Sequence, residues 1–208
     1  MNQVVLVGDS DIAYWPKDLQ PCQAEASNHE PLVSGHPGAT LAGVLPNLRR
    51  LFKETNESLT TESTLFVVAC AGENDIGEGL SLEKSVRDLS EFVNTVLEQT
   101  TCCKVVLIFL GPKFEPWLED DPSYKKKYTA MGMAFQKCLN DYKESHPSIH
   151  FVDCLTMFCG ETANLPGARF GGRAKADPKY FSSDRLHLSR EGYAVWKQEV
   201  EAIIQREK

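Results

Sequence analysis

Three continuous apolar runs stand out along the chain, and each ends in a turn of polar residues or glycine. They cover residues 3–7, 64–71 and 104–110. Runs of this length without polar alternation are typical of strands buried on both faces of a parallel sheet. Two weaker strand signals lie at 31–34 and 149–152. The pattern therefore predicts a central sheet of five parallel strands.

Between these strands, apolar residues recur at the spacing of an amphipathic helix. The expected helices cover residues 11–15, 41–52, 81–99, 122–145 and 189–204. Pro46 should kink or restart the helix in which it falls. The segment 160–183, rich in glycine, proline and basic residues, is expected to be a surface excursion. Strands that alternate with helices predict a three-layer α/β/α architecture, here a single domain over residues 1–208.

Composition places the chain among ordinary globular proteins and narrows its partners. The 208 residues are 42% hydrophobic and 25% charged, with a formal net charge of −7. An acidic surface argues against nucleic acid and anionic membranes as partners. No apolar run is long enough for a membrane span, and the first has only four apolar residues, 4–7, so no signal peptide is expected either.

The cysteines point to a reducing environment. There are seven, an odd number, and no two have the Cys-x-x-Cys spacing of zinc or redox motifs. Free thiols are typical of intracellular proteins, so we expect a cytoplasmic protein, and the cysteine spacing argues against a zinc or redox site.

Polar residues follow the strands where catalytic groups of α/β proteins gather. Asp9 and Ser10 follow the first strand, Gly38 follows the second, and the sequence 73–75 (Glu-Asn-Asp) follows the third. The carboxyl ends of parallel strands meet at one edge of a sheet, where ligands bind. The three turns should therefore lie close together.

A serine at this edge needs a base, and the sequence offers one. A serine hydroxyl is a weak nucleophile unless a neighbouring group takes its proton, a role that histidine fills near neutral pH. Asp184 stands three residues before His187, so one turn of chain can supply a base and the carboxylate that orients it. The backbone N–H groups of Ser10 and Gly38 and the side-chain amide of Asn74 are available to stabilise an oxyanion.

These residues resemble the motif blocks of the SGNH (GDSL-type) hydrolases, in the family's order along the whole chain. The blocks are Gly8-Asp9-Ser10, Gly38, Gly72-Glu73-Asn74-Asp75 and Asp184-Arg185-Leu186-His187. The resemblance implies a flavodoxin-like sheet and hydrolysis of esters, thioesters or amides without a cofactor. It also implies that Ser10 is the nucleophile, that His187 and Asp184 complete a triad, and that Ser10, Gly38 and Asn74 form the oxyanion hole.

Three departures from the family pattern bear on the substrate. Asp11 follows the serine where Ile or Leu is frequent, Glu73 stands where a small or neutral residue is common, and Arg185 replaces a frequent glycine. Asp11, beside the nucleophile, either repels anionic substrates or caps the following helix. Among the loop aromatics, Trp117 and Phe181 are the candidates for substrate contact.

The main hypothesis is a serine esterase acting on small-molecule esters with short, acetyl-type acyl groups. Thioesterase and lysophospholipase activities share the same motifs. Asp9 and Asp11 after a strand also resemble the Asp-x-Asp of haloacid-dehalogenase-type phosphatases, which would use Mg²⁺, although residues 110–112 lack the hydroxyl that such enzymes need. A binding module with a silent triad is the remaining alternative, and the sequence does not indicate an oligomeric state.

Overall fold

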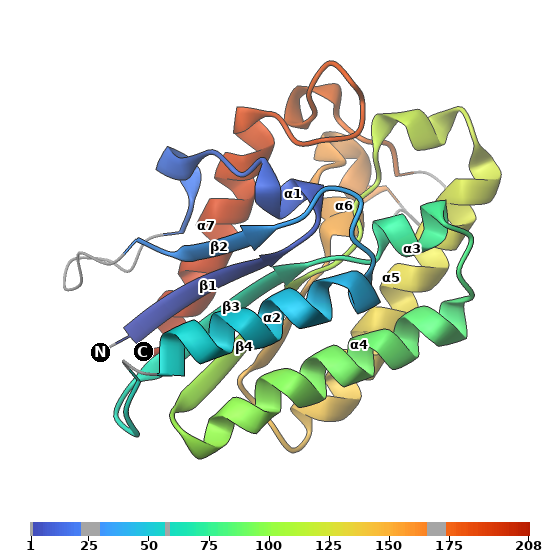
Figure 1. Ribbon diagram of the computed structural model, residues 1–208. Helices are drawn as coiled ribbons and strands as arrows, with labels where there is room; N and C mark the ends of the chain where they lie inside the picture. The colour runs from blue at the N-terminus through green and yellow to red at the C-terminus, as the bar shows by residue number, and fades with distance from the viewer. Residues whose placement is uncertain (1, 22–29, 57–58, 166–173) are drawn as a thin grey trace.

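The computed structural model describes residues 2–21, 30–56, 59–165 and 174–208, and its centre is one sheet of parallel strands (Figure 1). The strands are β1 (Asn2–Gly8), β2 (Leu32–Gly35), β3 (Thr64–Cys70), β4 (Lys104–Leu110) and β5 (Ile149–Val152). They lie in the order β2-β1-β3-β4-β5 and pair in parallel throughout. The predicted five-stranded parallel sheet is confirmed.

Helices cover both faces of the sheet (Figure 1). On one face lie α2 (Leu41–Asn56), α4 (Leu82–Leu97) and α5 (Pro122–Lys143); on the other lie α1 (Ser10–Ala13), α6 (Cys154–Met157) and α7 (Arg190–Glu207). Along β1, Val5 and Val7 face the first set, whereas Val4 and Leu6 face the second. Both faces are therefore buried, which explains why the strands are apolar without alternation.

Shorter elements connect these layers. They are α3 (Glu73–Gly77) and the 3-10 turns η1 (Lys17–Leu19), η2 (Glu98–Thr101), η3 (Pro116–Glu119), η4 (Gly160–Asn164) and η6 (Pro178–Tyr180). The last two belong to the expected surface excursion, of which residues 166–173 lie outside the described part of the chain.

The helices agree with the sequence pattern except at Pro46. Ser81 and Ser189 cap α4 and α7 as their positions suggest. The expected restart at Pro46 is wrong, because α2 continues through it. Leu45 and Leu48 on either side of Pro46 are buried in the core. Their packing outweighs the hydrogen bond that proline cannot donate.

Gly35 on β2 has no side chain, and this allows α1 to lie directly against the strand. A Cβ atom at Gly35 would lie 2.1 Å from the backbone nitrogen of Ala13, closer than any real contact. Only glycine therefore allows α1 to pack against the end of β2. Because α1 begins at Ser10, this contact sets the height of that serine above the sheet.

Two sequence expectations concern properties of the whole chain. The six cysteines among the described residues are free thiols, and Cys22 lies outside that part. In the same described ranges, no helix combines the length and the apolar character needed to cross a bilayer.

Candidate functional site

Ser10 lies at the start of α1, immediately after β1. Asp9 caps the helix, since its Oδ1 accepts a hydrogen bond from the backbone nitrogen of Asp11 at 3.0 Å. Tyr193 of α7 donates its hydroxyl to the carbonyl of Asp11 at 2.9 Å and so holds the turn from the other side. The Ser10 side chain is partly buried, and its backbone N–H meets no acceptor among the described residues. Asp9 thus organises the turn that carries Ser10.

The turn after β2 and the turn after β3 are bonded to each other at the same edge. The side-chain amide of Asn74 in α3 donates to the carbonyl of Ala39 at 3.1 Å and, more weakly, to Asp9 Oδ2 at 3.5 Å. Asp75, next to it, accepts a hydrogen bond from the backbone nitrogen of Leu41 at 3.0 Å. The expected clustering of the three turns is thereby observed.

Gly38 borders open space at this edge. Its φ of +79° is a conformation that favours glycine, and no heavy atom lies within 4 Å of the place where a Cβ would be. Its backbone N–H, like that of Ser10, has no acceptor in the described part of the chain. These two N–H groups and the Asn74 amide thus belong to the turns that follow β1, β2 and β3.

Asp184 and His187 form a close pair in the loop before α7. His187 Nδ1 lies 2.7 Å from Asp184 Oδ2, while Asp184 Oδ1 accepts hydrogen bonds from Ser182 Oγ at 2.6 Å and from the backbone nitrogen of His187 at 3.0 Å. Partial burial opposes ionisation of Asp184, but these hydrogen bonds outweigh it and hold the pKa of that carboxyl well below its ordinary value. Asp184 is therefore a lasting anion beside the imidazole.

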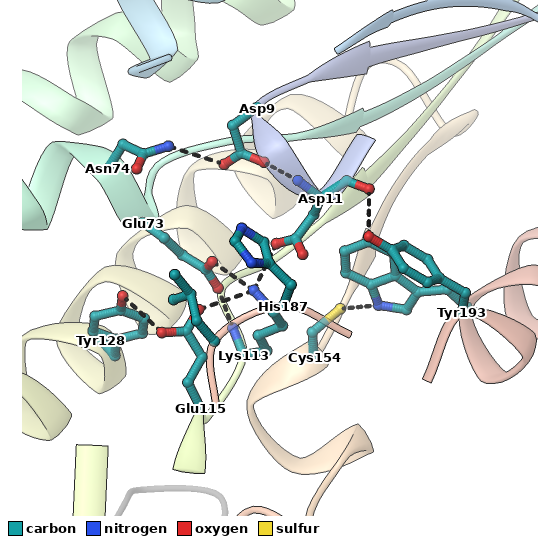
Figure 2. A network of polar contacts seen from close by, with 12 residues as sticks. Asp9, Asp11, Glu73, Asn74, Lys113, Glu115, Tyr128, Cys154, His187 and Tyr193 are labelled. Atoms are coloured by element: carbon teal, nitrogen blue, oxygen red, sulfur yellow. Dashed lines mark hydrogen bonds and ion pairs between the residues drawn. The ribbon is translucent and has the colours of Figure 1, made fainter. Parts of the chain in front are cut away.

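His187 faces α1, although within the described residues no hydrogen bond joins it to Ser10. The ring of Tyr14 stands edge-on to the imidazole, with 4.9 Å between the ring centroids. His187 also interacts electrostatically with Asp11, the residue after Ser10 (Figure 2). Side chains of this kind commonly come into hydrogen-bonding reach only once substrate is bound. The Asp–His pair is formed here, and the serine lies on the neighbouring element.

The loop that carries His187 is fixed by Arg185. With φ +62°, Arg185 is the one non-glycine residue of the described ranges in the left-handed region, a conformation that favours glycine. Its guanidinium donates to the carbonyl of Pro116 at 2.7 Å and pairs with Asp120 at 2.8 Å. The side chain thereby ties this loop to η3.

Two substitutions separate the backbone of Arg185 from its side chain. Arg185→Gly removes the contacts with Pro116 and Asp120 but keeps the left-handed conformation without strain. Arg185→Ala removes the same contacts and retains the strain, so it should be less stable than the glycine variant by about 1 kcal/mol. Chemical denaturation of both proteins measures the difference. Equal stabilities would contradict the strain.

A buried lysine lies beneath these turns, and the sequence analysis missed it. Lys113 follows β4 and is only 1% exposed. Its Nζ lies 2.6 Å from Asp11 Oδ2, 2.7 Å from Glu73 Oε2 and 3.0 Å from Glu115 Oε1 (Figure 2). Burial alone would lower the pKa of this ammonium, but the three carboxyl groups outweigh burial and raise it well above its ordinary value. The signal in the sequence was the position of Lys113, just past a strand end at the edge that carries Ser10.

The three residues that we expected to contact the substrate, Asp11, Trp117 and Phe181, are partly or fully buried. Asp11 is 2% exposed and paired with Lys113, so its charge faces inward. Phe181 is 6% exposed and packs against Phe158 in the core. Trp117 is partly buried, and its indole nitrogen donates to Glu115. Tyr14, which the sequence analysis did not single out, is 52% exposed beside His187 and is the aromatic side chain best placed to meet a substrate.

A group of three side chains near Ser10 bears on the phosphatase alternative. Asp9, Asp11 and Cys70 offer ligand atoms that lie within 4.8 Å of one another. Burial is the main factor that raises the pKa of Asp9 and of the Cys70 thiol well above their ordinary values, and the neighbouring acidic groups add to it. A metal site or a nucleophilic Asp9 needs these groups in their deprotonated forms, and burial disfavours that form of both.

Comparisons with solved structures find the same fold in other proteins. A GDSL-like lipase from Bacteroides thetaiotaomicron VPI-5482 has a TM-score of 0.68 at 18% identity, covering 99% of this chain and 89% of that one. A psychrotrophic esterase from Pseudoalteromonas sp., in a structure inhibited by monoethylphosphonate, has a TM-score of 0.61 at 18% identity, with 99% and 98% covered. At these identities the likeness shows a shared fold.

The sequence itself decides the family. No curated protein matches the chain. The family model of the GDSL-like lipase/acylhydrolases, however, matches residues 7–195, which include the Ser10 turn and the Asp184–His187 loop. The chain belongs to the GDSL-like lipase/acylhydrolase family.

Proposed function

We propose that this protein is a serine hydrolase that cleaves short-chain carboxylic esters through an acyl-enzyme intermediate. The observation that carries the proposal is the Asp184–His187 pair, 2.7 Å apart, beside the helix that begins at Ser10. This arrangement and membership of an acylhydrolase family support the proposal that the three side chains act as orienting acid, base and nucleophile.

The reaction follows from these roles. Because Nδ1 of His187 faces Asp184, Nε2 is the nitrogen free to act as a base. It takes the proton of Ser10 Oγ while that oxygen attacks the ester carbonyl. The tetrahedral intermediate then collapses, and the imidazolium returns the proton to the leaving alcohol. Water, activated by the same imidazole, next cleaves the acyl-serine and releases the acid. Asp184 stabilises the imidazolium in both steps.

Stabilisation of the oxyanion is assigned to groups around Ser10 that are available to donate. The N–H groups of Ser10 and Gly38 have no acceptor among the described residues, which suits donors held ready for a developing charge. The amide of Asn74 is held in place by its 3.1 Å bond to Ala39, and its second N–H makes only the 3.5 Å contact with Asp9. That weakly used hydrogen is the third donor in this proposal.

The acyl preference rests on the surroundings of His187. Among the described residues, Tyr14 is the exposed aromatic ring that contacts His187, while Trp117 and Phe181 are engaged in packing. One exposed ring can cover a small acyl or alcohol group but offers little apolar area to a long chain. An acetyl-type ester is therefore the substrate class we favour over a lysophospholipid or a long-chain thioester.

The test is a substrate panel with the purified protein. We expect p-nitrophenyl acetate to be hydrolysed with higher kcat/KM than the octanoate and dodecanoate esters, equally in EDTA and in added Mg²⁺. Acetyl and palmitoyl thioesters of coenzyme A and p-nitrophenyl phosphate complete the panel. Preference for palmitoyl thioester would indicate a thioesterase, and Mg²⁺-dependent phosphate release would overturn the proposal. Absence of turnover on every substrate would favour a binding module.

A further inference from the structure

Two of the groups bound by Lys113 are chain neighbours of proposed catalytic residues. Asp11 directly follows Ser10 in α1, and Glu73 directly precedes Asn74 in α3. The Lys113 ammonium bonds to both, at 2.6 and 2.7 Å. Its backbone nitrogen also donates to Glu73 at 2.8 Å, so both oxygens of that carboxylate are held by one residue. Lys113 thus joins the element of the nucleophile to the element of the amide donor (Figure 2).

Lys113 has no capacity left for a direct part in the reaction. An ammonium has three N–H donors, and those of Lys113 go to Asp11, Glu73 and Glu115. The side chain is 1% exposed, so it does not reach a bound substrate. Its raised pKa keeps it protonated, which excludes a role as a base or nucleophile near neutral pH.

The elements that Lys113 joins are too short to hold their positions alone. Helix α1 has 4 residues and α3 has 5, so each is little more than one turn. Isolated turns of this length are not stable, and their positions depend on tertiary contacts. A charge-assisted hydrogen bond from one ammonium to each turn supplies such a contact directly beside Ser10 and beside Asn74.

We propose that Lys113 is a positioning residue that fixes the separation between Ser10 and the Asn74 amide, and thereby the geometry of the oxyanion hole. This inference rests on the proposed esterase function. Misplacement of a reacting group by about 1 Å costs on the order of 100-fold in rate, so loosening either turn should lower kcat. KM should change little, because the cluster is buried away from the substrate.

Lys113→Met would leave buried carboxylates without a partner and can fail to fold. The experiment therefore changes the two carboxylates separately; we call the bond from Lys113 to Asp11 and the bond from Lys113 to Glu73 the two arms of the contact. In Glu73→Gln, one of the two acceptor oxygens becomes a donor. In Asp11→Asn, the carboxylate charge beside Ser10 is lost. For each variant we expect kcat on p-nitrophenyl acetate to fall about 10- to 100-fold, with KM within about twofold of wild type. The double variant should lose little more than the worse single variant, because one broken arm already frees the two turns.

Leu89→Ala is the matched control for lost stability. Leu89 is fully buried in α4 and takes no part in the cluster, so its truncation lowers the melting temperature without touching the site. Assays are made well below every melting temperature and at the pH plateau of each variant. The proposal is overturned if the arm variants keep kcat within twofold of wild type, or if Leu89→Ala loses as much kcat as they do. An inactive wild type would instead refute the esterase function itself.

Discussion

Replacing Ser10 with alanine is expected to lower kcat for ester hydrolysis by about 10⁴- to 10⁶-fold. The hydroxyl is the proposed nucleophile, and within the described residues no second hydroxyl stands at the start of α1. The substitution removes one atom from a partly buried side chain, so the melting temperature should change little. Hydrolysis of p-nitrophenyl acetate measures the loss.

A covalent probe makes this prediction independent of the natural substrate. A fluorophosphonate phosphorylates activated serines, so it should label wild type and leave Ser10→Ala unlabelled. Ser145→Ala is the matched control, since Ser145 is exposed just before β5, at the opposite edge of the sheet. Labelling that persists in Ser10→Ala, or turnover unchanged by that substitution, would rule out the serine mechanism.

His187→Ala is expected to cost nearly as much, because serine, base and orienting acid act as one unit and their losses do not add. The imidazole is 23% exposed and lies at the rim of the site, so the fold should survive. His146→Ala, beside Ser145, serves as the matched control. A His187→Ala variant as active as wild type would refute the assignment of the base.

The pH dependence offers a further check on the same pair. The pKa of Asp184 is lowered by the hydrogen bonds it accepts from Ser182 and His187, so Asp184 stays ionised well below pH 4. Protonation of Asp184 therefore cannot account for a fall in kcat/KM between pH 7 and pH 5. In the proposed mechanism such a fall belongs to the general base and not to the acid that orients it. The same acidic limb in His187→Ala would contradict this assignment.

Much of the fold follows from the one-dimensional pattern. The run 104–110 coincides with β4 and the weaker signal 149–152 coincides with β5, because strands buried on both faces require uninterrupted apolar residues. Topology then predicts that the turns after β1, β2 and β3 meet. Local chemistry also predicts the caps, since Ser81 and Ser189 stand where their helices begin.

The features that the sequence did not predict are those set by the direction in which a side chain points. Strand order places Lys113 at the correct edge, but only the folded structure shows its ammonium pointing inward to Asp11. The same limit explains the expectations for aromatic residues, because Phe181 turns into the core and Tyr14 turns out toward His187. Loop residues have no periodicity from which burial can be inferred, and so the sequence does not separate the two cases.

The contact between Gly35 and α1 has a consequence for how natural variation in this chain should be interpreted. Gly35 lies on an edge strand and carries no functional group, so a change to alanine would ordinarily count as conservative. The added methyl group would nevertheless meet the backbone of Ala13 at 2.1 Å and displace the helix that begins with Ser10. We therefore expect a mild substitution at this position to lower the proposed activity as strongly as a change at Ser10 would. Chemical similarity alone does not rank the effects of variants here.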